Sequence, residues 1–470
     1  MAHDGFFEQL HNACGGQLTV GDDINPRYLR DFLNQREGRA LAVVRPRTTT
    51  EVAAIVRLCH NTQTPVVPQG GNTGYRAGAT PDDSGHAVVL SLENMNAVRD
   101  INSAASSITV EAGCILANVQ RVAEEAGLFF SLQLGAAGSC HIGGNLATNA
   151  GGLNVLRYGS ARELCLGVEA VLPSGEVMNL LSSLRKDNTG YDLKNLLIGS
   201  EGTLGVITAA TLKLFPRLVD RATAYAIVPD VKAALKVLDL CQKITGGHVE
   251  SFELMPEILF KLLQKNMPDV PLPFSVLPPL AVLVEVAAEE SASLSLQEAL
   301  AEALACGLIT DAALASSEAQ RQQFWAVREL SPEATKREGS WSKLDVSLPA
   351  DNLADFIDAV NHLIVDDVAG QYIVAFGHAG DGNLHLSLRP RGQAPEKNPA
   401  LVAMLEEQIL DAVYERGGSF SAEHGIGQTK LAAMKRYKNT TALTAMRAIK
   451  KALDPNNIMN PGKMIDVTSN

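Results

Sequence analysis

The sequence has little of what marks a secreted, membrane-spanning or nucleic-acid-binding protein. Its seven cysteines are odd in number and form no C-x-x-C pair, so we expect reduced thiols and a cytoplasmic location. The longest apolar run, near 280–288, is far shorter than the roughly 20 residues that a membrane helix needs. The first residues, Met1–Phe6, have neither the basic and apolar parts of a secretory signal nor the arginines of a transit peptide. No Lys/Arg run offsets the net charge of −12, which disfavours a nucleic-acid partner.

What remains has the bulk composition of a soluble globular enzyme, with 46% hydrophobic and 20% charged residues in a chain of 470. This length allows about two or three domains. Short apolar segments alternate with glycine turns up to about residue 215, and the glycine density falls after Pro216. We therefore expect three segments: 1–219, 220–421 and a mostly helical 422–470.

Periodicity predicts several individual elements. A hairpin is expected from strands at 166–172 and 177–180, which flank a Pro-Ser-Gly-Glu turn. A helix capped by Thr50 is expected after the first strand, and a second helix at 113–127. Beyond Pro216 the pattern predicts strands at 223–228, 249–254 and 280–286, and helices at 231–244, 290–307 and 317–330.

Histidine is scarce, with 10 in the chain, yet three histidines lie in two short glycine-bordered segments, Gly377–His385 and Ser421–Gly425. Two imidazoles and a carboxylate, here His378, His385 and Glu423, form a common ligand set for a divalent metal. Zinc suits this set, and manganese or cobalt would also be compatible. His424, beside the carboxylate, is a candidate general base. A strand ending at 376–377 and another starting at 384, joined by a tight turn, would bring the first two histidines together.

Three glycine-rich segments indicate a second ligand. Pro68–Gly74 has three glycines with Asn and Thr, and consecutive N–H groups of such a loop can bind phosphate. Residues 134–152 are almost all small, which suits a backbone lying against a flat cofactor, and Gly199–Thr208 again brings small residues before a strand. No G-x-G-x-x-G follows a first strand, and 425–430 lacks a Walker ending, so neither a Rossmann site nor a P-loop is supported.

Together with 454–463, these segments resemble, in order from about residue 40 to 465, the FAD-linked D-2-hydroxy-acid dehydrogenases. This family of vanillyl-alcohol-oxidase-type flavoproteins includes D-2-hydroxyglutarate and D-lactate dehydrogenases. The resemblance implies an α+β fold: a two-subdomain FAD-binding domain of the vanillyl-alcohol-oxidase/p-cresol-methylhydroxylase type at 1–219, and an α+β substrate-binding domain with an antiparallel sheet at 220–421. The segment 422–470 should return to the FAD domain.

The resemblance also implies the roles of individual residues. The FAD pyrophosphate should be held by Pro68, Gly70, Gly71, Asn72, Thr73 and Gly74. The flavin and its phosphates should be lined by Ser139, Gly143, Gly144, Asn145 and Thr148. The adenine–ribose side or the flavin should be contacted by Gly202, Gly205, Val206 and Ile207. Asn460 should approach the isoalloxazine ring. We expect dissociable FAD, because His141 is not a covalent anchor in the relatives that the sequence resembles.

In the implied reaction, the metal binds the C1 carboxylate and the 2-hydroxyl of a D-2-hydroxy acid such as D-2-hydroxyglutarate or D-lactate. His424 takes the hydroxyl proton, and C2 passes hydride to flavin N5. Arg328 and Lys343 match segments that contact substrate carboxylates, and Ser387 is expected in the same pocket. Pro332 and Ser387 stand where hydroxyglutarate-specific relatives carry a hydroxyl and an amide side chain, which leaves the substrate open.

Two alternatives remain at this point. A metallohydrolase could use the His/His/Glu set with purely structural glycine loops, and it would be colourless. A flavoprotein of the same fold without dehydrogenase activity, such as an alkyl-transfer synthase, would leave the metal motif unexplained. For a dehydrogenase, an electron-transfer flavoprotein, a quinone or a cytochrome could accept the electrons, and the chain could form a homodimer.

Overall fold

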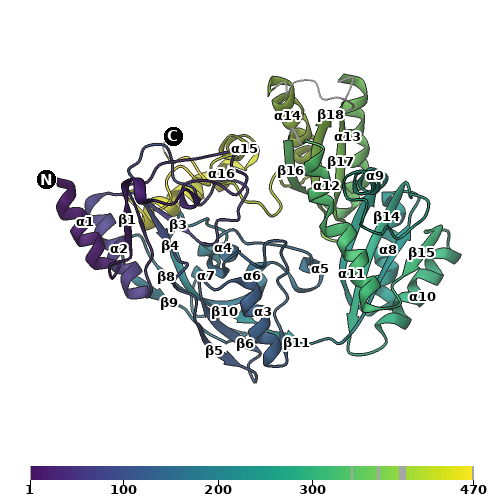
Figure 1. Ribbon diagram of the computed structural model, residues 1–470, viewed down its shortest axis with the longest axis horizontal. Coiled ribbons are helices and arrows are strands. Elements are labelled where there is room, and N and C mark those ends of the chain that lie inside the picture. Colours follow the sequence, from purple (N-terminus) through teal and green to yellow (C-terminus); the bar gives the residue numbers. More distant parts are fainter. Residues whose placement is uncertain (1, 340–341, 368–370, 391–398, 468–470) are drawn as a thin grey trace. The chain divides into compact units, whose positions relative to one another are not determined.

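The computed structural model describes residues 2–339, 342–367, 371–390 and 399–467, and these form two compact units (Figure 1). Unit 1 comprises Met1–Gly152, Gly159–Arg217 and Glu423–Asn470. Unit 2 comprises Leu153–Tyr158 and Leu218–Ala422. The sequence does not indicate that the short segment Leu153–Tyr158, which carries helix α5 (Val155–Tyr158), belongs to unit 2.

Unit 1 contains a four-stranded sheet in the order β1–β2–β4–β3. Its strands are β1 (Leu18–Val20), β2 (Ala42–Val44), β4 (Val88–Ser91) and β3 (Val66–Gln69). Strands β2, β4 and β3 run parallel, and β1 is antiparallel to β2. Helices α1 (Ala2–Ala13) and α2 (Thr49–Thr62) pack on this sheet, and the 3-10 turns η1 (Gly21–Asp23) and η2 (Pro26–Tyr28) follow β1.

The N-cap of α2 corrects one sequence prediction. Thr48, not Thr50, caps the helix, because Thr48 is the last residue with extended backbone and its side chain accepts the N–H of Glu51 at 3.2 Å. The apolar face expected for this helix is present, since Val52, Ile55 and Val56 are fully buried.

A second sheet of unit 1 has five antiparallel strands in the order β5–β6–β10–β8–β9. These are β5 (Val98–Asn102), β6 (Ser107–Glu111), β10 (Val206–Lys213), β8 (Cys165–Val171) and β9 (Val177–Asn179). The pairing of β8 with β9 confirms the predicted hairpin. The helix predicted at 113–127 is shorter, α3 (Leu116–Glu125), because Ile115 before it is still extended. The smaller elements are β7 (Leu128–Phe129), which pairs with β11 (Phe215–Pro216), and the helices α4 (Ile142–Ala147), α6 (Ala161–Leu164) and α7 (Leu193–Leu197).

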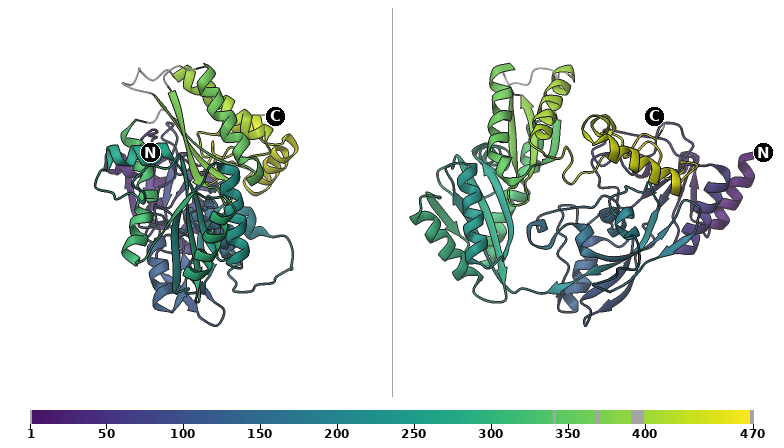
Figure 2. Two further views of the ribbon diagram at one scale, coloured as in Figure 1. Left: turned by 90° about the vertical axis from the view of Figure 1, so that its right-hand side faces the viewer. Right: turned by 180° about the vertical axis from the view of Figure 1, so that it is seen from behind.

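The C-terminal segment is part of unit 1 and carries helices α15 (Leu431–Tyr437) and α16 (Thr440–Leu453), drawn in yellow in Figure 2. Beyond α16 the chain pairs with the β3 edge of the four-stranded sheet. Val66 donates its N–H to Ile458 and accepts the N–H of Asn460, both at 2.8 Å. The last described residues therefore cover a strand edge formed by residues near the start of the chain.

Unit 2 is built on one antiparallel sheet of seven strands in the order β15–β12–β14–β13–β17–β18–β16, which confirms the predicted antiparallel sheet. Its strands are β12 (Asp220–Ile227), β13 (Val249–Pro256), β14 (Leu280–Ala288), β15 (Asp311–Leu314), β16 (Ser342–Ser347), β17 (Gln371–His378) and β18 (Asn383–Pro390).

Helices cover both faces of this sheet (Figure 1). One face packs against α8 (Val231–Ile244), α10 (Ala292–Ala305), α13 (Leu353–Asp367) and α14 (Pro399–Glu415), with the 3-10 turn η3 (Ala350–Asn352) before α13. The other face packs against α9 (Glu257–Asn266), α11 (Glu318–Glu329) and α12 (Ser331–Arg337). The helix predicted at 231–244 is confirmed residue for residue, whereas α9, α12, α13 and α14 were not predicted. No helix in the described part of the chain has both the length and the apolar character that crossing a bilayer requires.

Candidate active site

A cavity of about 950 Å³, open solvent at its mouth included, lies in unit 1 where the three glycine-rich segments converge. Most of the residues predicted for FAD line it: Pro68, Gly70, Gly71, Asn72, Thr73, Gly74, Gly143, Gly144, Asn145, Thr148, Gly202, Gly205, Val206 and Ile207. Ser139 and Asn460 are not among the lining residues. Ser139 is exposed, and the buried Asn460 lies behind the wall, where its amide donates to the carbonyls of Gly78 and Glu201 at 2.9 and 2.6 Å.

The wall of this cavity consists largely of backbone. A Cβ atom on Gly71 would lie 2.1 Å from the carbonyl oxygen of Ser139, so no side chain fits between these two loops. In contrast, a Cβ atom on Gly74 or Gly144 would meet nothing within 4 Å, although both residues line the cavity. Side chains at these two glycines would therefore project into open space that a flat cofactor can fill.

Two polar residues of the wall fit a dinucleotide ligand. Asn72 is fixed in the left-handed conformation (φ +52°), and its amide donates to the carbonyls of Arg27 and Arg30. His141 Nδ1 is buried and has no hydrogen-bond partner among the described residues. Burial lowers the pKa of His141, so the ring is neutral at physiological pH and can exchange a hydrogen bond with a ligand.

Glu423 and His424 follow unit 2 in sequence but belong to unit 1. Glu423 Oε1 accepts the N–H of Gly152 at 2.6 Å, which fixes the orientation of this carboxylate. His424 lines the cavity. Its ring packs edge to face against the ring of Tyr75, with centroids 4.6 Å apart. The next residue, Gly425, has φ +72°, and a Cβ atom there would lie 2.8 Å from Glu201 Oε1.

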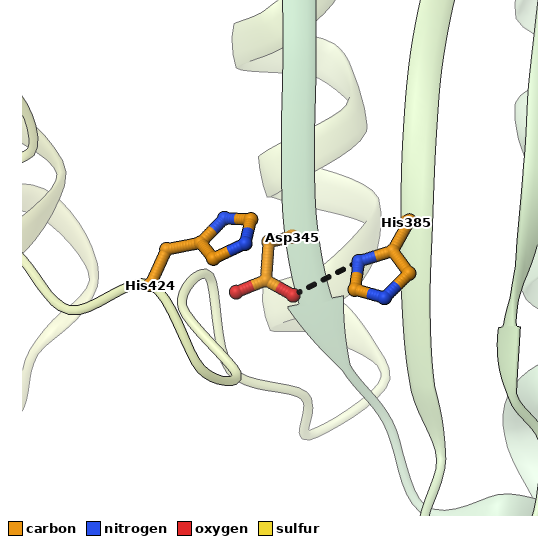
Figure 3. A group of neighbouring side chains, drawn as sticks. All are labelled: Asp345, His385 and His424. Atoms are coloured by element: carbon orange, nitrogen blue, oxygen red, sulfur yellow. Dashed lines mark ion pairs between the residues drawn. The ribbon is translucent and has the colours of Figure 1, made fainter. Parts of the chain in front are cut away.

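The two histidines of the Gly377–His385 motif lie together in unit 2, as the strand–turn–strand pattern predicts. His378 ends β17, and His385 on β18 is opposite Phe376 in the register. Their ring centroids are 5.4 Å apart. Each ring also contacts a fully buried carboxylate through Nδ1, His378 with Glu253 and His385 with Asp345, the latter at 3.5 Å (Figure 3). Because a carboxylate only accepts, Nδ1 of His378 is the donor in its hydrogen bond with Glu253.

Glu253 also binds the guanidinium of Arg328, whose Nε donates to it at 2.5 Å. Burial opposes ionisation of Glu253, but the charge of Arg328 and the contact with His378 outweigh it, and the pKa of this carboxyl is well below its usual range. Arg328, predicted to contact substrate, is buried, with its guanidinium 5.1 Å from the ring centroid of Phe376. The structure thus shows Arg328 holding the carboxylate that orients His378.

Sequence reasoning missed Glu253 and Asp345, although both leave a signal. Each is an acidic residue with apolar residues directly before and after it in its strand, Phe252 and Leu254 around Glu253, and Leu344 and Val346 around Asp345. A carboxylate in such a strand is buried and needs a cationic or hydrogen-bonding partner. The sequence does not show which partner each carboxylate has, because Glu253 and His378 are 125 residues apart and Asp345 and His385 are 40 apart.

The remaining predicted substrate residues, Lys343 and Ser387, are direct cross-strand neighbours on β16 and β18. Ser387 is buried and Lys343 exposed. The pKa of Lys343 is lowered, first by partial loss of solvation and then by the positive charges of Arg389 and Lys336. Pro332 is exposed in the first turn of α12.

Comparisons with known proteins match sequence ranges in both units of the chain. A model of the FAD binding domain matches residues 40–181, and the model described as FAD linked oxidases, C-terminal domain, matches 219–464. The chain is 40% identical over 456 residues to the D-2-hydroxyglutarate dehydrogenase, mitochondrial, of Bos taurus, covering 96% of this chain and 81% of that protein. It is 34% identical over 441 residues to the D-2-hydroxyglutarate dehydrogenase of Xanthomonas citri pv. viticola, covering 93% and 92%. The chain belongs to the family of FAD-linked D-2-hydroxy-acid dehydrogenases.

Solved structures show the fold of this D-2-hydroxy-acid dehydrogenase at low identity. A p-cresol methylhydroxylase with substrate bound matches with a TM-score of 0.76 at 16% identity, over 100% of this chain and 98% of that chain. An alkyldihydroxyacetonephosphate synthase matches with 0.74 at 15% identity, over 97% and 84%. These likenesses confirm the predicted vanillyl-alcohol-oxidase/p-cresol-methylhydroxylase fold. The family match confirms FAD as the cofactor of the dehydrogenase. The metallohydrolase alternative explains neither the fold of a flavoprotein nor the match to FAD-binding families.

Proposed function

We propose that this chain oxidises the 2-hydroxyl group of a D-2-hydroxy acid to the 2-oxo acid, with D-2-hydroxyglutarate as the first candidate substrate, and that a divalent metal ion assists. The observation that carries the proposal is the pair of histidines in unit 2, His378 and His385, whose Nδ1 atoms each contact a buried carboxylate. Metal-binding histidines almost always have such a partner on the second ring nitrogen, which fixes the tautomer and raises the basicity of the ligating nitrogen.

For the third ligand we propose Glu423, which completes a His/His/carboxylate set for zinc, or for manganese or cobalt. In unit 1 its orientation is already fixed by the N–H of Gly152. A divalent ion held by these residues would polarise the C1 carboxylate and the 2-hydroxyl group of the substrate.

For the proton we propose His424 as general base. It lines the FAD cavity, and its ring packs against Tyr75. Its place beside Glu423 in the chain would bring an imidazole to the hydroxyl group that the metal polarises. Bound FAD supplies the other half of the chemistry, acceptance of a hydride from C2 at N5.

For the substrate we propose contacts with Lys343 and Ser387, with Arg328 acting mainly through Glu253. The names of the relatives favour D-2-hydroxyglutarate, and D-lactate is the natural comparison because it lacks the second carboxylate. A two-carboxylate substrate suits a face that carries several cations.

An anaerobic screen of D- and L-2-hydroxy acids for bleaching of the flavin absorbance tests the proposal, with and without a strong chelator. We expect bleaching by D-2-hydroxyglutarate and not by its L-enantiomer, loss of bleaching after the metal is removed, and recovery when zinc is added back. Bleaching at the parental rate in fully metal-depleted protein would refute the role of the metal. Absence of bleaching by every D-2-hydroxy acid would refute the function.

For the reduced flavin we propose an electron-transfer flavoprotein or a quinone as acceptor, in the cytoplasm. All seven cysteines are unpaired thiols, which is compatible with a reducing compartment. Reoxidation of the reduced enzyme by each acceptor class, followed by stopped-flow absorbance, separates these acceptors.

A further inference from the structure

A buried arginine that neither the motifs nor the family resemblance assigns lies on the same strand as the proposed metal ligand. Along β18, His385, Ser387 and Arg389 alternate with Leu384, Leu386 and Leu388, so the first three share one face of the sheet. Across on β17, Tyr372 is the direct neighbour of Arg389. This is the face covered by α9, α11 and α12.

Among the residues that the structure describes, the guanidinium of Arg389 has no hydrogen-bond or ion-pair partner. Its side chain is 0% exposed and is the largest of the fully buried side chains in the described chain. Nε, Nη1 and Nη2 are all buried without a hydrogen-bond partner, and no carboxylate of the described residues lies within 4.0 Å of them. A buried charge without a counter-ion opposes folding strongly, so a protein retains one only where something else uses it.

The charged groups around Arg389 do not neutralise its positive charge. Lys343, opposite Ser387 on β16, lies close enough for Arg389 and Lys336 to lower its pKa. The acid whose field reaches Arg389, Glu338, already pairs with Lys265 at 2.8 Å and accepts the amide of Asn266 at 2.9 Å. Tyr372, the other group that Arg389 senses, is a phenol whose pKa burial raises, so it carries no charge near neutral pH.

We propose that Arg389 binds the second carboxylate of the substrate, and hence that the substrate is a D-2-hydroxy dicarboxylic acid. This inference rests on the proposed function for the position of the first carboxylate. Along an antiparallel strand, His385 and Arg389 are about 13 Å apart between their Cα atoms, a separation that two long side chains and a small dicarboxylic acid can span. The small, buried Ser387 occupies the middle of that row.

The same arrangement accounts for the two departures from the hydroxyglutarate-specific pattern. A guanidinium binds a carboxylate through two parallel hydrogen bonds, which a hydroxyl or an amide side chain cannot equal. Arg389, two residues beyond Ser387 on the same face, takes over the anion contact that Pro332 and Ser387 do not make. It is a specificity-determining residue, and it contacts the end of the substrate far from the reacting carbon.

The test compares dicarboxylic with monocarboxylic substrates in Arg389→Met and Arg389→Lys, with Lys243→Met as the control. Lys243 is an exposed residue of α8, which covers the opposite face of the sheet. In Arg389→Met we expect the KM for D-2-hydroxyglutarate and D-malate to rise about 10- to 100-fold, as for a lost charged hydrogen-bonding partner. We expect kcat to change by less than about threefold, because the lost contact stabilises the bound substrate and the transition state equally. The KM for D-lactate should also change by less than about threefold, because D-lactate lacks the second carboxylate. Arg389→Lys should recover part of the loss, and Lys243→Met should match the parent.

Thermal unfolding supplies a readout that needs no turnover. Because the guanidinium is unpaired in the unliganded protein, Arg389→Met should have an equal or higher Tm than the parent. D-2-Hydroxyglutarate should raise the Tm of the parent and of Lys243→Met, but not that of Arg389→Met.

An equal change of KM for di- and monocarboxylic acids in Arg389→Met, or no change for either, would overturn the assignment. So would an equal rise of Tm with D-2-hydroxyglutarate in parent and variant. If no hydroxy acid bleaches the parental flavin, the proposed function fails, and the dicarboxylate-dependent shift in Tm still decides the role of Arg389.

Discussion

The two units differ in the chemical groups that form their proposed ligand sites. The lining of the FAD cavity of unit 1 includes eight glycines, with Arg76 and Glu201 among its few charged residues. One face of the sheet of unit 2 carries, among apolar residues, a buried group of charged side chains in which Glu253 pairs with Arg328 and His378. A backbone wall is set by local conformation, whereas a charge network depends on contacts between distant strands.

The difference has a consequence for mutation. A change in the wall of unit 1 should act locally, through space, and leave the fold intact. A change in the network of unit 2 should propagate, since removing one charge leaves its partner buried and unpaired. The following variants are ordered from the largest expected effect to the smallest.

His424→Ala removes the proposed base and should lower the rate of flavin reduction by substrate about 10²- to 10⁴-fold. FAD should remain bound, because the cavity wall around it is mostly backbone. Anaerobic stopped-flow absorbance measures the rate, and the flavin spectrum after gel filtration measures retention. Tyr75→Phe keeps the ring that packs against His424 and should stay near the parental rate. Parental reduction by His424→Ala would rule out the assignment.

Glu253→Gln should weaken zinc binding about 10- to 100-fold, since the Nδ1 partner of His378 loses its charge. It should also destabilise unit 2 by about 3 kcal/mol, because Arg328 is left as an uncompensated buried cation. Glu253 has a depressed folded pKa, so its contribution to stability is present above the ordinary carboxyl pKa of about 4.3 and is lost as the pH falls below it.

Metal titration and denaturant unfolding measure the two effects of Glu253→Gln. The double variant Glu253→Gln/Arg328→Met should regain stability without regaining zinc, because it removes the unpaired cation as well. Equal stability of the single and double variants would mean that the two side chains are not energetically coupled.

Gly144→Leu should reduce FAD affinity about 5- to 150-fold, the effect of overfilling a tight site by 1–3 kcal/mol, and leave the fold intact. The added side chain meets no protein atom within 4 Å of its Cβ, and leucine is a better helix former than glycine in α4. Gly138→Leu is the matched control, since Gly138 also has no neighbour within 4 Å but does not line the cavity. Fluorescence titration of the apoprotein with FAD measures the affinity; equal affinities of the two variants would contradict the cavity assignment.

Lys463→Met tests a buried charge in unit 1. Burial lowers the pKa of Lys463 from 10.5 to about 8, with Asp82 opposing the shift. Between these pH values the unfolded chain binds more protons than the folded chain, so stability rises with pH across this window. At pH 7 the variant should therefore be more stable than the parent by about 1–3 kcal/mol, and the advantage should vanish near pH 11.

The control for Lys463→Met is Lys450→Met. Lys450 is also buried, but its ammonium donates to the carbonyls of Thr203 and Met459 at 2.8 Å and pairs with Asp454. Removing it should destabilise the apoprotein in urea unfolding, the opposite sign. If both variants changed the free energy of unfolding in the same direction, the hydrogen bonds and ion pair of a buried ammonium would not decide its contribution to stability here.

The parts that sequence reasoning predicted are those specified within a few residues. The loop Pro68–Gly74 lines the cavity because its glycines alone permit the close approach, and His378 meets His385 because one tight turn joins their strands. The helix at 231–244 follows from Asp230, whose side chain accepts the N–H of Ala233 at its start.

The parts that sequence reasoning missed depend on pairing between distant segments. Glu253 and Asp345 gain their roles from strands that meet in the sheet, and Arg389 shows its lack of a partner only once the sheet is assembled. Sequence reasoning made no prediction for α13 or α14, although both contribute apolar residues such as Phe356 and Ile409 to the core of unit 2. The approach of Asn460 to the flavin stays a prediction; its backbone has φ +45°, and its amide donates to the carbonyls of Gly78 and Glu201.

The pairing of Val66 with Ile458 and Asn460 has a consequence for the order of events during synthesis. A ribosome releases β3 long before it makes residues 458–460, with the whole of unit 2 in between. Until those residues emerge, the four-stranded sheet has an exposed edge that invites pairing with other chains. FAD binding competence should therefore be acquired only after residues 458–460 emerge, and nascent chains stalled in unit 2 should depend on chaperones to remain soluble.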